Sequence, residues 1–291
     1  KPTGTKMITT IIISRDRPAQ LHLLLESLKI NGGNLFDITV LYESSSDYFE
    51  EGYKQTQHHF SKKYRRDVSF PIRWKAKKSE NINEDLLELL SNPRELVCLF
   101  NDQNILFDKV CSYRKIKSLF THHSLSSLSL RLGNNTVIQN PYEAASFHID
   151  QPKEGDFVLD RFLVWDATKL KSYTNFATPF STNGHIYYYN LIKKFLERTN
   201  VDDFEQFELV VQKALYNGAF VGKIPPNMAC LEYSAVLHNS CNKVSDYKVT
   251  RYDNSELGIN HRYTDGMRIQ YNDFDFKHVS KPYQDFTVYF R

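Results

Sequence analysis

The chain has 291 residues, of which 41% are hydrophobic and 24% are charged, and its formal net charge is +3. This is the composition of an ordinary globular protein, long enough for one large α/β domain or two small ones. The charge is too small to predict binding to nucleic acid, and no apolar run approaches the ~20 residues of a membrane-spanning helix. We therefore expect no nucleic acid among the partners and no membrane span.

The first part of the chain alternates predicted strands and helices. Residues 8–13 are β-branched throughout and predict a strand; Pro18 suits the first turn of a helix that leucines at helical spacing carry to Lys29. Residues 38–42 predict the next strand, so the segment is a βαβ unit with a right-handed crossover. Further helices are expected at residues 48–64, 81–91 and 107–121, and further strands at 72–75, 96–100 and 125–132.

The strand at 96–100 is the most informative segment, because its five apolar residues predict a strand buried on both faces. Asn101, Asp102, Gln103 and Asn104 follow it directly. In open α/β sheets the ligand binds outside the carboxyl ends of the strands. A carboxylate among amides at that place suits a divalent cation beside a diphosphate, although a simple polar turn is the competing interpretation.

The second part of the chain has a different pattern. Residues 140–155 are polar and predict a loop, residues 157–165 predict a strand, and residues 186–198 and 202–216 predict helices. From residue 245 onward the chain is polar and rich in tyrosine. We interpret this end as a tail that packs over the domain rather than as a second domain.

Four motifs occur in a fixed order along the chain. They are residues 14–21 after the first strand, 42–53 after the second, 100–104 after the buried strand, and 183–187 with 202–205 further on. This order resembles the GT-A class of nucleotide-sugar glycosyltransferases, above all a group found in bacteria and large algal viruses. A late segment at residues 242–246 matches that group too, and the resemblance covers residues 7 to about 266.

The resemblance implies a single α/β, GT-A-like domain over residues 1–291, with a Rossmann-type, mostly parallel sheet and helices on both faces. Residues 7–122 would be the nucleotide-sugar-binding half, 123–245 the acceptor-side half and 246–291 a peripheral C-terminal segment. The implied activity is inverting transfer of a hexosyl, deoxyhexosyl or pentosyl group from a nucleoside diphosphate sugar, UDP-linked, to a glycan hydroxyl. Mn²⁺ or Mg²⁺ would assist as a Lewis acid. The implied location is the cytoplasm of a bacterium or of a virus-infected host cell.

The same resemblance assigns residues to the site. A carboxylate would remove the acceptor proton, and guanidinium groups would meet phosphate; Lys75, Lys77 and Lys78 could neutralise the diphosphate, although a solvated cluster is the simpler interpretation. The catalytic candidates are Glu205, then Glu208 and Asp203; the donor candidates are Ser14, Arg15, Arg17, Glu43, Ser44, Ser45, Asn101, Asp102 and Arg131; the acceptor candidates are Trp165, Asn183, Gly184 and His185; the metal candidates are Asp102, Asn104 and His238.

Two positions depart from the family pattern. Asn104 and Asn183 stand where the family has aspartates, which weakens a metal site or removes a candidate base. One alternative is therefore a catalytically weak or inactive carbohydrate- or nucleotide-binding relic of the same fold. Another is a sugar nucleotidyltransferase, although that class carries a glycine-rich loop after its first strand and residues 14–20 contain no glycine.

Overall fold

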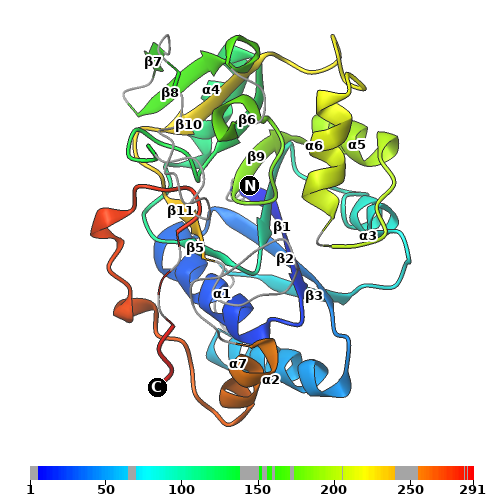
Figure 1. Ribbon diagram of the computed structural model, residues 1–291, viewed down its shortest axis with the longest axis vertical. Coiled ribbons are helices and arrows are strands. Elements are labelled where there is room, and N and C mark those ends of the chain that lie inside the picture. Colours follow the sequence, from blue (N-terminus) through cyan, green and yellow to red (C-terminus); the bar gives the residue numbers. More distant parts are fainter. Residues whose placement is uncertain are drawn as a thin grey trace, which may run out of the picture.

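The computed structural model describes residues 6–64, 70–137, 151–152, 156–158, 161–170, 174–204, 206–239, 255–284, 286 and 288–291. Within these ranges the chain forms an α/β fold on one large sheet and a two-stranded ribbon (Figure 1). No helix in them has the length and apolar character needed to cross a membrane. The late motif at residues 242–246 lies outside the described residues, as does most of the predicted loop at 140–155.

The large sheet has the strand order β3-β2-β1-β4-β9-β6-β10-β8-β7. Among the described strands only β9 and β8 run against the others, so the prediction of a mostly parallel sheet is confirmed. The strands are β1 (Ile8–Arg15), β2 (Phe36–Glu43), β3 (Ile72–Ala76), β4 (Leu96–Asn101), β6 (Leu125–Ser129), β7 (Asp156–Val158), β8 (Phe162–Asp166), β9 (His185–Tyr188) and β10 (Asn227–Leu231). The ribbon pairs β5 (Asn104–Leu106) with β11 (Val236–His238).

Helices cover both faces of the sheet. Because side chains alternate along a strand, Ile8 and Ile12 of β1 pack into a core with α1, α2 and α4, whereas Ile11 and Ile13 pack into a core with α3, α5 and α6. Helices α3, α5 and α6 lie together at the right of Figure 1. The helices are α1 (Pro18–Gly32), α2 (Asp47–Lys63), α3 (Ile82–Leu89), α4 (Tyr113–His123), α5 (Tyr189–Arg198), α6 (Phe207–Tyr216) and α7 (Glu256–Thr264), with 3-10 turns η1 (Ala167–Lys169), η2 (Asn175–Ala177), η3 (Tyr271–Asp273) and η4 (Phe276–His278).

Four predicted segments differ in the structure, and the first is the single strand expected at 157–165, which is two antiparallel strands, β7 and β8. The predicted helix at 186–198 begins only at Tyr189, because residues 185–188 form β9 and pair with β4 on one side and β6 on the other. The helix expected from residue 107 begins at Tyr113, after the short strand β5. The helix expected from residue 202 begins at Phe207, so Asp203 lies in the connection before it.

The C-terminal segment packs on the first two helices. Helix α7 contacts α1 and α2, and Tyr263 is completely buried between them. The approach depends on Gly52 of α2, where an added Cβ would lie 2.4 Å from Asn260 Oδ1 and 2.5 Å from Pro18 Cγ. A side chain at residue 52 would therefore push Pro18 of α1 and Asn260 of α7 away from α2.

Candidate functional site

The carboxyl ends of β1, β2 and β4 meet at one edge of the sheet, where the first three motifs end. The register pairs Arg15 with Glu43 and Ile13 with Asn101. The backbone N–H of Asp102 continues the ladder by donating to Ile13 O at 3.1 Å. Ligands of open α/β sheets bind outside this edge, so it is the candidate donor site.

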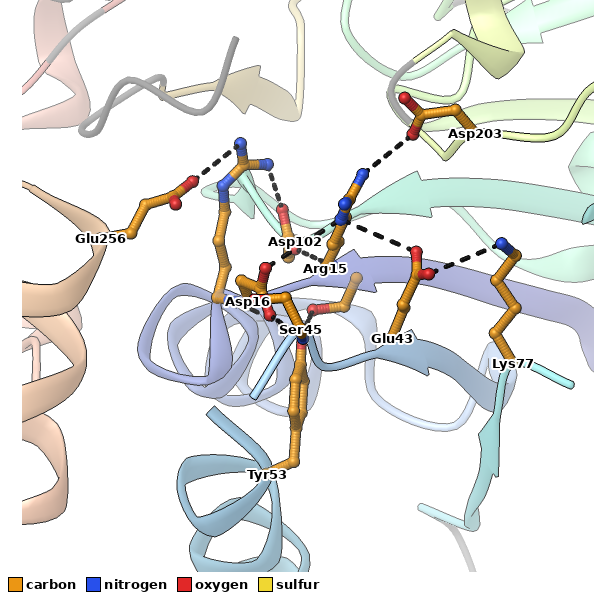
Figure 2. A network of polar contacts seen from close by, with 11 residues as sticks. Arg15, Asp16, Glu43, Ser45, Tyr53, Lys77, Asp102, Asp203 and Glu256 are labelled. Carbon is orange, nitrogen blue, oxygen red and sulfur yellow. Dashed lines mark hydrogen bonds and ion pairs between the residues drawn. The ribbon is translucent and has the colours of Figure 1, made fainter. Parts of the chain in front are cut away.

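Arg15 is the centre of a network of ion pairs at this edge (Figure 2). Its Nη1 lies 3.2 Å from Asp203 Oδ1, and its Nε lies 3.7 Å from Glu43 Oε2. Lys77 Nζ lies 3.6 Å from Glu43 Oε1 and donates to the backbone oxygen of Asp202 at 3.2 Å. The Lys77 side chain is only 12% exposed, so it is part of this network rather than a solvated charge.

Asp102 is buried between two arginines, with 2% of its surface exposed. Its Oδ2 accepts from the backbone N–H of Arg15 at 3.0 Å, and its Oδ1 accepts from Arg17 Nη1 at 3.2 Å. On its other side the Arg17 guanidinium lies 3.9 Å from Glu256 of α7. Burial raises the pKa of Asp102, against the opposing effect of Arg17. Arg17 thus occupies the place beside Asp102 where we expected a cation to bind.

The serine loop after β2 is held against β1. The backbone N–H of Ser45 donates to Asp16 Oδ1 at 2.7 Å, and Ser44 Oγ donates to Glu50 Oε2 at 2.8 Å. Ser45 is exposed, so its hydroxyl is accessible beside the Arg15 network. The structure therefore brings Glu43, Ser44 and Ser45 to the same edge as Arg15.

Asn183 is the centre of a second polar cluster, between β4, β9 and the β5–β11 ribbon. Its Oδ1 accepts from Asn101 Nδ2 at 2.7 Å and from Asn104 Nδ2 at 2.9 Å, and lies 2.8 Å from His238 Nδ1. Asn104 and His238 face each other in the ribbon and are completely buried. Because an amide oxygen can only accept, His238 carries a proton on Nδ1.

The amide nitrogen of Asn183 bonds Glu208 of α6. Glu208 Oε2 accepts from Asn183 Nδ2 at 2.9 Å, from Ser181 Oγ at 3.1 Å, and from Thr182 N and Oγ1 at 2.7 and 2.8 Å. Its Oε1 accepts from Gln212 Nε2 at 3.0 Å. Glu208 therefore fastens the start of α6 to the loop before β9.

The three expected metal ligands do not converge. The Asp102 carboxylate bonds Arg17 on the β1 side, whereas Asn104 and His238 bond Asn183 on the β9 side. Mn²⁺ and Mg²⁺ need several oxygen ligands around one point. Among the described residues, the one group of three His, Cys, Asp or Glu side chains close enough to share an ion lies elsewhere. The described residues at the candidate site therefore do not fit a divalent cation.

Arg131 and Trp165 lie inside the protein rather than on its surface. Arg131 is 2% exposed, and its guanidinium lies 4.3 Å from the centre of the Tyr283 ring. Trp165 is 3% exposed and donates through Nε1 to Phe176 O at 2.8 Å. Neither side chain lies in the Arg15 network, and Trp165 offers no open ring face for an acceptor sugar.

Gly184 and His185 hold β9 in the sheet. Gly184 has a φ of 72°, and an added Cβ would lie 3.1 Å from both methyl groups of Val236, so glycine alone suits this position. His185 pairs with Leu99 in the sheet and is 1% exposed. Burial and the charge of Arg131 lower the pKa of His185 well below its usual value. Both residues therefore support the fold.

The three catalytic candidates fare differently. Glu205 lies outside the described residues. Glu208 is bonded to the loop before β9, as shown above. Asp203 reaches the Arg15 network, where its side chain remains 34% exposed, so it is the described candidate that lies at the sheet edge.

Sequence reasoning overlooked three residues of this region. Asp16 has a φ of 54° and turns its carboxylate to the serine loop. The Tyr53 hydroxyl lies 2.7 Å from Ser14 Oγ and accepts from the Arg17 backbone N–H at 3.3 Å. Glu256 comes from α7. Asp16 and Tyr53 lie within the quoted motifs and could have been found there, whereas nothing local marks Glu256.

Comparisons with known proteins give resemblance in structure alone. No protein-family profile matches the chain, and no curated protein matches it in sequence. A crystal structure of S. aureus TarS matches with 12% identity and a TM-score of 0.44, covering 79% of this chain and 36% of that one; a shorter TarS structure matches with 13% identity and a TM-score of 0.46, covering 79% and 59%. The chain thus spans about a third to three-fifths of the TarS chains.

Two further solved structures also match this chain. The mannosyltransferase PcManGT from Pyrobaculum calidifontis, in complex with GDP-Man and Mn²⁺, matches with 10% identity and a TM-score of 0.34, covering 46% of this chain and 38% of that one. The 4-diphosphocytidyl-2C-methyl-D-erythritol synthase from Anaerococcus prevotii matches with 12% identity and a TM-score of 0.38, covering 79% and 89%.

Proposed function

We propose that the protein transfers a sugar, with inversion, from a UDP-linked donor to a glycan hydroxyl. The observation that carries the proposal is the network of Arg15, Glu43 and Lys77 at the carboxyl edge of β1 and β2. Two cations at the ligand-binding edge of an α/β sheet are suited to a diphosphate, which an arginine can bind through two N–H groups. The order of the four motifs supports the same class.

The donor would exchange partners with the carboxylates of this network. Arg15 is paired with Asp203, and Lys77 with Glu43; a diphosphate offers more negative charge than either carboxylate and would compete for both cations. Glu43 and the exposed Ser45 hydroxyl would then be left to accept from and donate to the ribose hydroxyls or the base. Arg15 and Lys77 would neutralise the leaving diphosphate.

The transfer needs a group that takes the acceptor proton. The acceptor oxygen forms a bond to the anomeric carbon, the bond from that carbon to the diphosphate breaks with its electron pair on the diphosphate, and a carboxylate receives the hydroxyl proton. Glu205 remains the proposed base, and Asp203, whose side chain lies at the sheet edge, is the alternative. The residues that the structure describes at this edge do not fit Mn²⁺ or Mg²⁺, so we assign no step to a metal.

A panel of nucleotides tests the donor. The melting temperature is measured with UDP, GDP, CDP and UDP-sugars, each with EDTA and with Mn²⁺, because a ligand of the native state stabilises it by about 2.7 kcal/mol at a hundredfold excess over its Kd. UDP should stabilise the protein in both media. Arg15→Ala should lose this effect, and Arg73→Ala, at an exposed arginine of β3 that pairs with Asp37, should keep it. Stabilisation by GDP alone would contradict the UDP assignment, and no stabilisation by any nucleotide would contradict the transferase proposal.

The relic alternative keeps one specific support. The family's loop aspartate is Asn183 here, and its amide is committed to Asn101, Asn104, His238 and Glu208. A relic would be stabilised by the nucleotide but release no UDP from any UDP-sugar, with or without an acceptor. Measuring UDP release from the same panel separates the two functions.

A further inference from the structure

A histidine–carboxylate cluster lies away from the candidate site, where α1, α2 and α7 pack together at the bottom of Figure 1. His22 and Glu26 are one turn apart on α1, and His59 comes from α2. One ligand atom from each of the three lies within 4.8 Å of the others. Nothing in the proposed transfer uses these residues.

A chain of hydrogen bonds fixes the tautomer of His22. Thr56 Oγ1 donates to Gly52 O at 3.0 Å, and its own oxygen lies 2.7 Å from the Tyr263 hydroxyl, which lies 2.8 Å from His22 Nδ1. A carbonyl can only accept, so Thr56 donates to it, Tyr263 donates to Thr56, and His22 donates from Nδ1 to Tyr263. His22 Nε2 is then left with a lone pair.

The lone pair of His22 Nε2 lies beside the Glu26 carboxylate and the His59 ring. His22 Nε2 lies 3.7 Å from Glu26 Oε1, and the His22 and His59 ring centres are 4.5 Å apart. His59 Nε2 is buried and has no hydrogen-bond partner. Burial lowers the pKa of His22, and lowers that of His59 to about 4, so both rings are neutral near pH 7. Two imidazole nitrogens and a carboxylate thus meet where a cation would be favourable.

The Lys63 ammonium group already forms an ion pair with Glu26. Lys63 Nζ lies 3.0 Å from Glu26 Oε1, but its side chain is 46% exposed and can turn into solvent. The cluster borders a groove of about 770 Å³ that includes His59, Lys54, Lys62, Lys63 and Arg268 in its lining. An ion would enter from this groove past His59, against the repulsion of these cationic side chains, which would in turn favour water or an anion as the fourth ligand.

We propose that His22, Glu26 and His59 form a binding site for a divalent transition metal, with Zn²⁺ as the preferred ion. Two imidazoles, one carboxylate and an open fourth position are an established ligand set for zinc. Zinc bonds of about 2.0–2.2 Å require the three side chains to draw together from their present spacing. The Tyr263 hydroxyl would orient His22 from behind, as groups around metal-bound histidines do.

The proposed ion would join three helices. His22 and Glu26 hold α1, His59 holds α2, and Tyr263 links His22 to α7. Since Glu256 at the start of α7 pairs with Arg17, the ion would also stabilise the helix that lies beside the candidate donor site.

Titration of the full chain, free of any histidine tag, tests the site. Zn²⁺ affinity is measured by competition with a coloured chelator, and Co²⁺ serves as a spectroscopic probe through the visible bands of tetrahedral coordination. One ion should bind per chain and raise the melting temperature. His59→Ala and Glu26→Gln should weaken binding by more than ~100-fold, beyond the effect typical of an outer-shell residue. His58→Ala, at the exposed neighbour in the same groove, should leave the affinity unchanged.

The Lys63 variant tests the competition directly. Lys63→Met removes the cation that now neutralises Glu26, so zinc should bind more tightly. The proposal is overturned if the wild-type chain binds no zinc below millimolar concentration, or if His59→Ala and His58→Ala bind alike. Circular dichroism of each variant confirms that the change is not unfolding.

Discussion

The Arg17 guanidinium lies 3.2 Å from the Asp102 carboxylate, with Glu256 on its other side. Asp102 and Arg17 are 2% and 11% exposed, so the pair is shielded from water at the edge where a donor would bind. Desolvation offsets much of what such a pair gains, but removing one partner leaves the other charge buried. Removing one partner of the Arg17–Asp102 pair should therefore cost more stability than the intact pair contributes.

Asp102→Ala should destabilise the fold by about 3 kcal/mol, because it leaves Arg17 without its nearest carboxylate. The free energy of unfolding in urea measures the effect. Glu197→Ala is the control, since it breaks an exposed pair with Lys193 on one helix and should change stability by less than about 0.5 kcal/mol. Equal effects of the two substitutions would show that the Asp102 pair is not buried in solution.

EDTA should leave the affinity for UDP unchanged, because Asp102, Asn104 and His238 bond different partners and form no shell for an ion. Calorimetric titration of UDP with EDTA and with Mn²⁺ measures this. A tenfold or larger gain with Mn²⁺ would mean that Arg17 releases Asp102 when the nucleotide binds, and the chain would then follow the metal-assisted scheme expected from its sequence.

Glu205→Gln should keep UDP affinity and lower turnover by about 10²–10⁴-fold, as loss of a general base does. Asp203→Asn should change KM more than kcat, since Asp203 pairs with the cation proposed to bind phosphate. Glu208→Gln should lower the melting temperature, because Glu208 accepts bonds from the loop before β9. If Asp203→Asn lost turnover and Glu205→Gln did not, Asp203 would be the base.

Asn183→Asp should destabilise the protein by about 2 kcal/mol near pH 7, because a carboxylate oxygen would replace the N–H that bonds Glu208. Adding Glu208→Gln should restore much of the loss, and a double-mutant cycle measures the coupling. Asn92→Asp, at an exposed position, is the control. A gain in transfer activity from Asn183→Asp would instead favour the relic function for the natural sequence.

Acidification should destabilise the protein through His22 and His59. Their pKa values are lowered by burial, that of His59 to about 4 from 6.5. Between these values the unfolded chain binds more protons than the folded one, so stability is present above pH 6.5 and is lost as the pH falls. The charges of Lys63 and Arg268 also disfavour protonation of the two rings, whereas the charge of Glu26 favours it.

Urea unfolding at several pH values between about 7 and 4.5 measures this loss. His59→Ala should show a shallower decline than the wild type, and His58→Ala should show the same decline. A wild-type stability that is constant over this range would show that the histidines are not buried as described.

The parts of the fold that sequence predicted correctly are those decided locally. The β-branched run of β1 and the apolar run of β4 occur in the strands themselves, and Pro18 marks the start of α1. β9 was predicted as helix because residues 186–189 continue without a break into the apolar pattern of α5. Its pairing with β4 and β6 comes from segments far away in the chain, which no local pattern records.

The candidate site shows the same division. Arg15 and Glu43 end their strands and Asp102 directly follows β4, and these strand ends meet at one edge, so the proximity of the three residues could be predicted from the order of strands. The partners of Asn183 come from β4, the β5–β11 ribbon and α6, and Glu256 reaches Arg17 from α7. Those contacts depend on packing, and the same is true of the burial that removes Trp165 and Arg131 from the surface.

The position of β9 has a consequence for the order of folding. β4 lies inside the sheet and pairs with β9, which follows only after β5, α4, β6, β7 and β8 have been made. During synthesis β4 therefore has an unpaired edge, and such an edge is a template for pairing with another chain. Tyr263 of α7, which bonds His22, is synthesised later still. Because closing such long loops slows folding, we expect the nascent chain to depend on protection from aggregation until the last helix has joined the first.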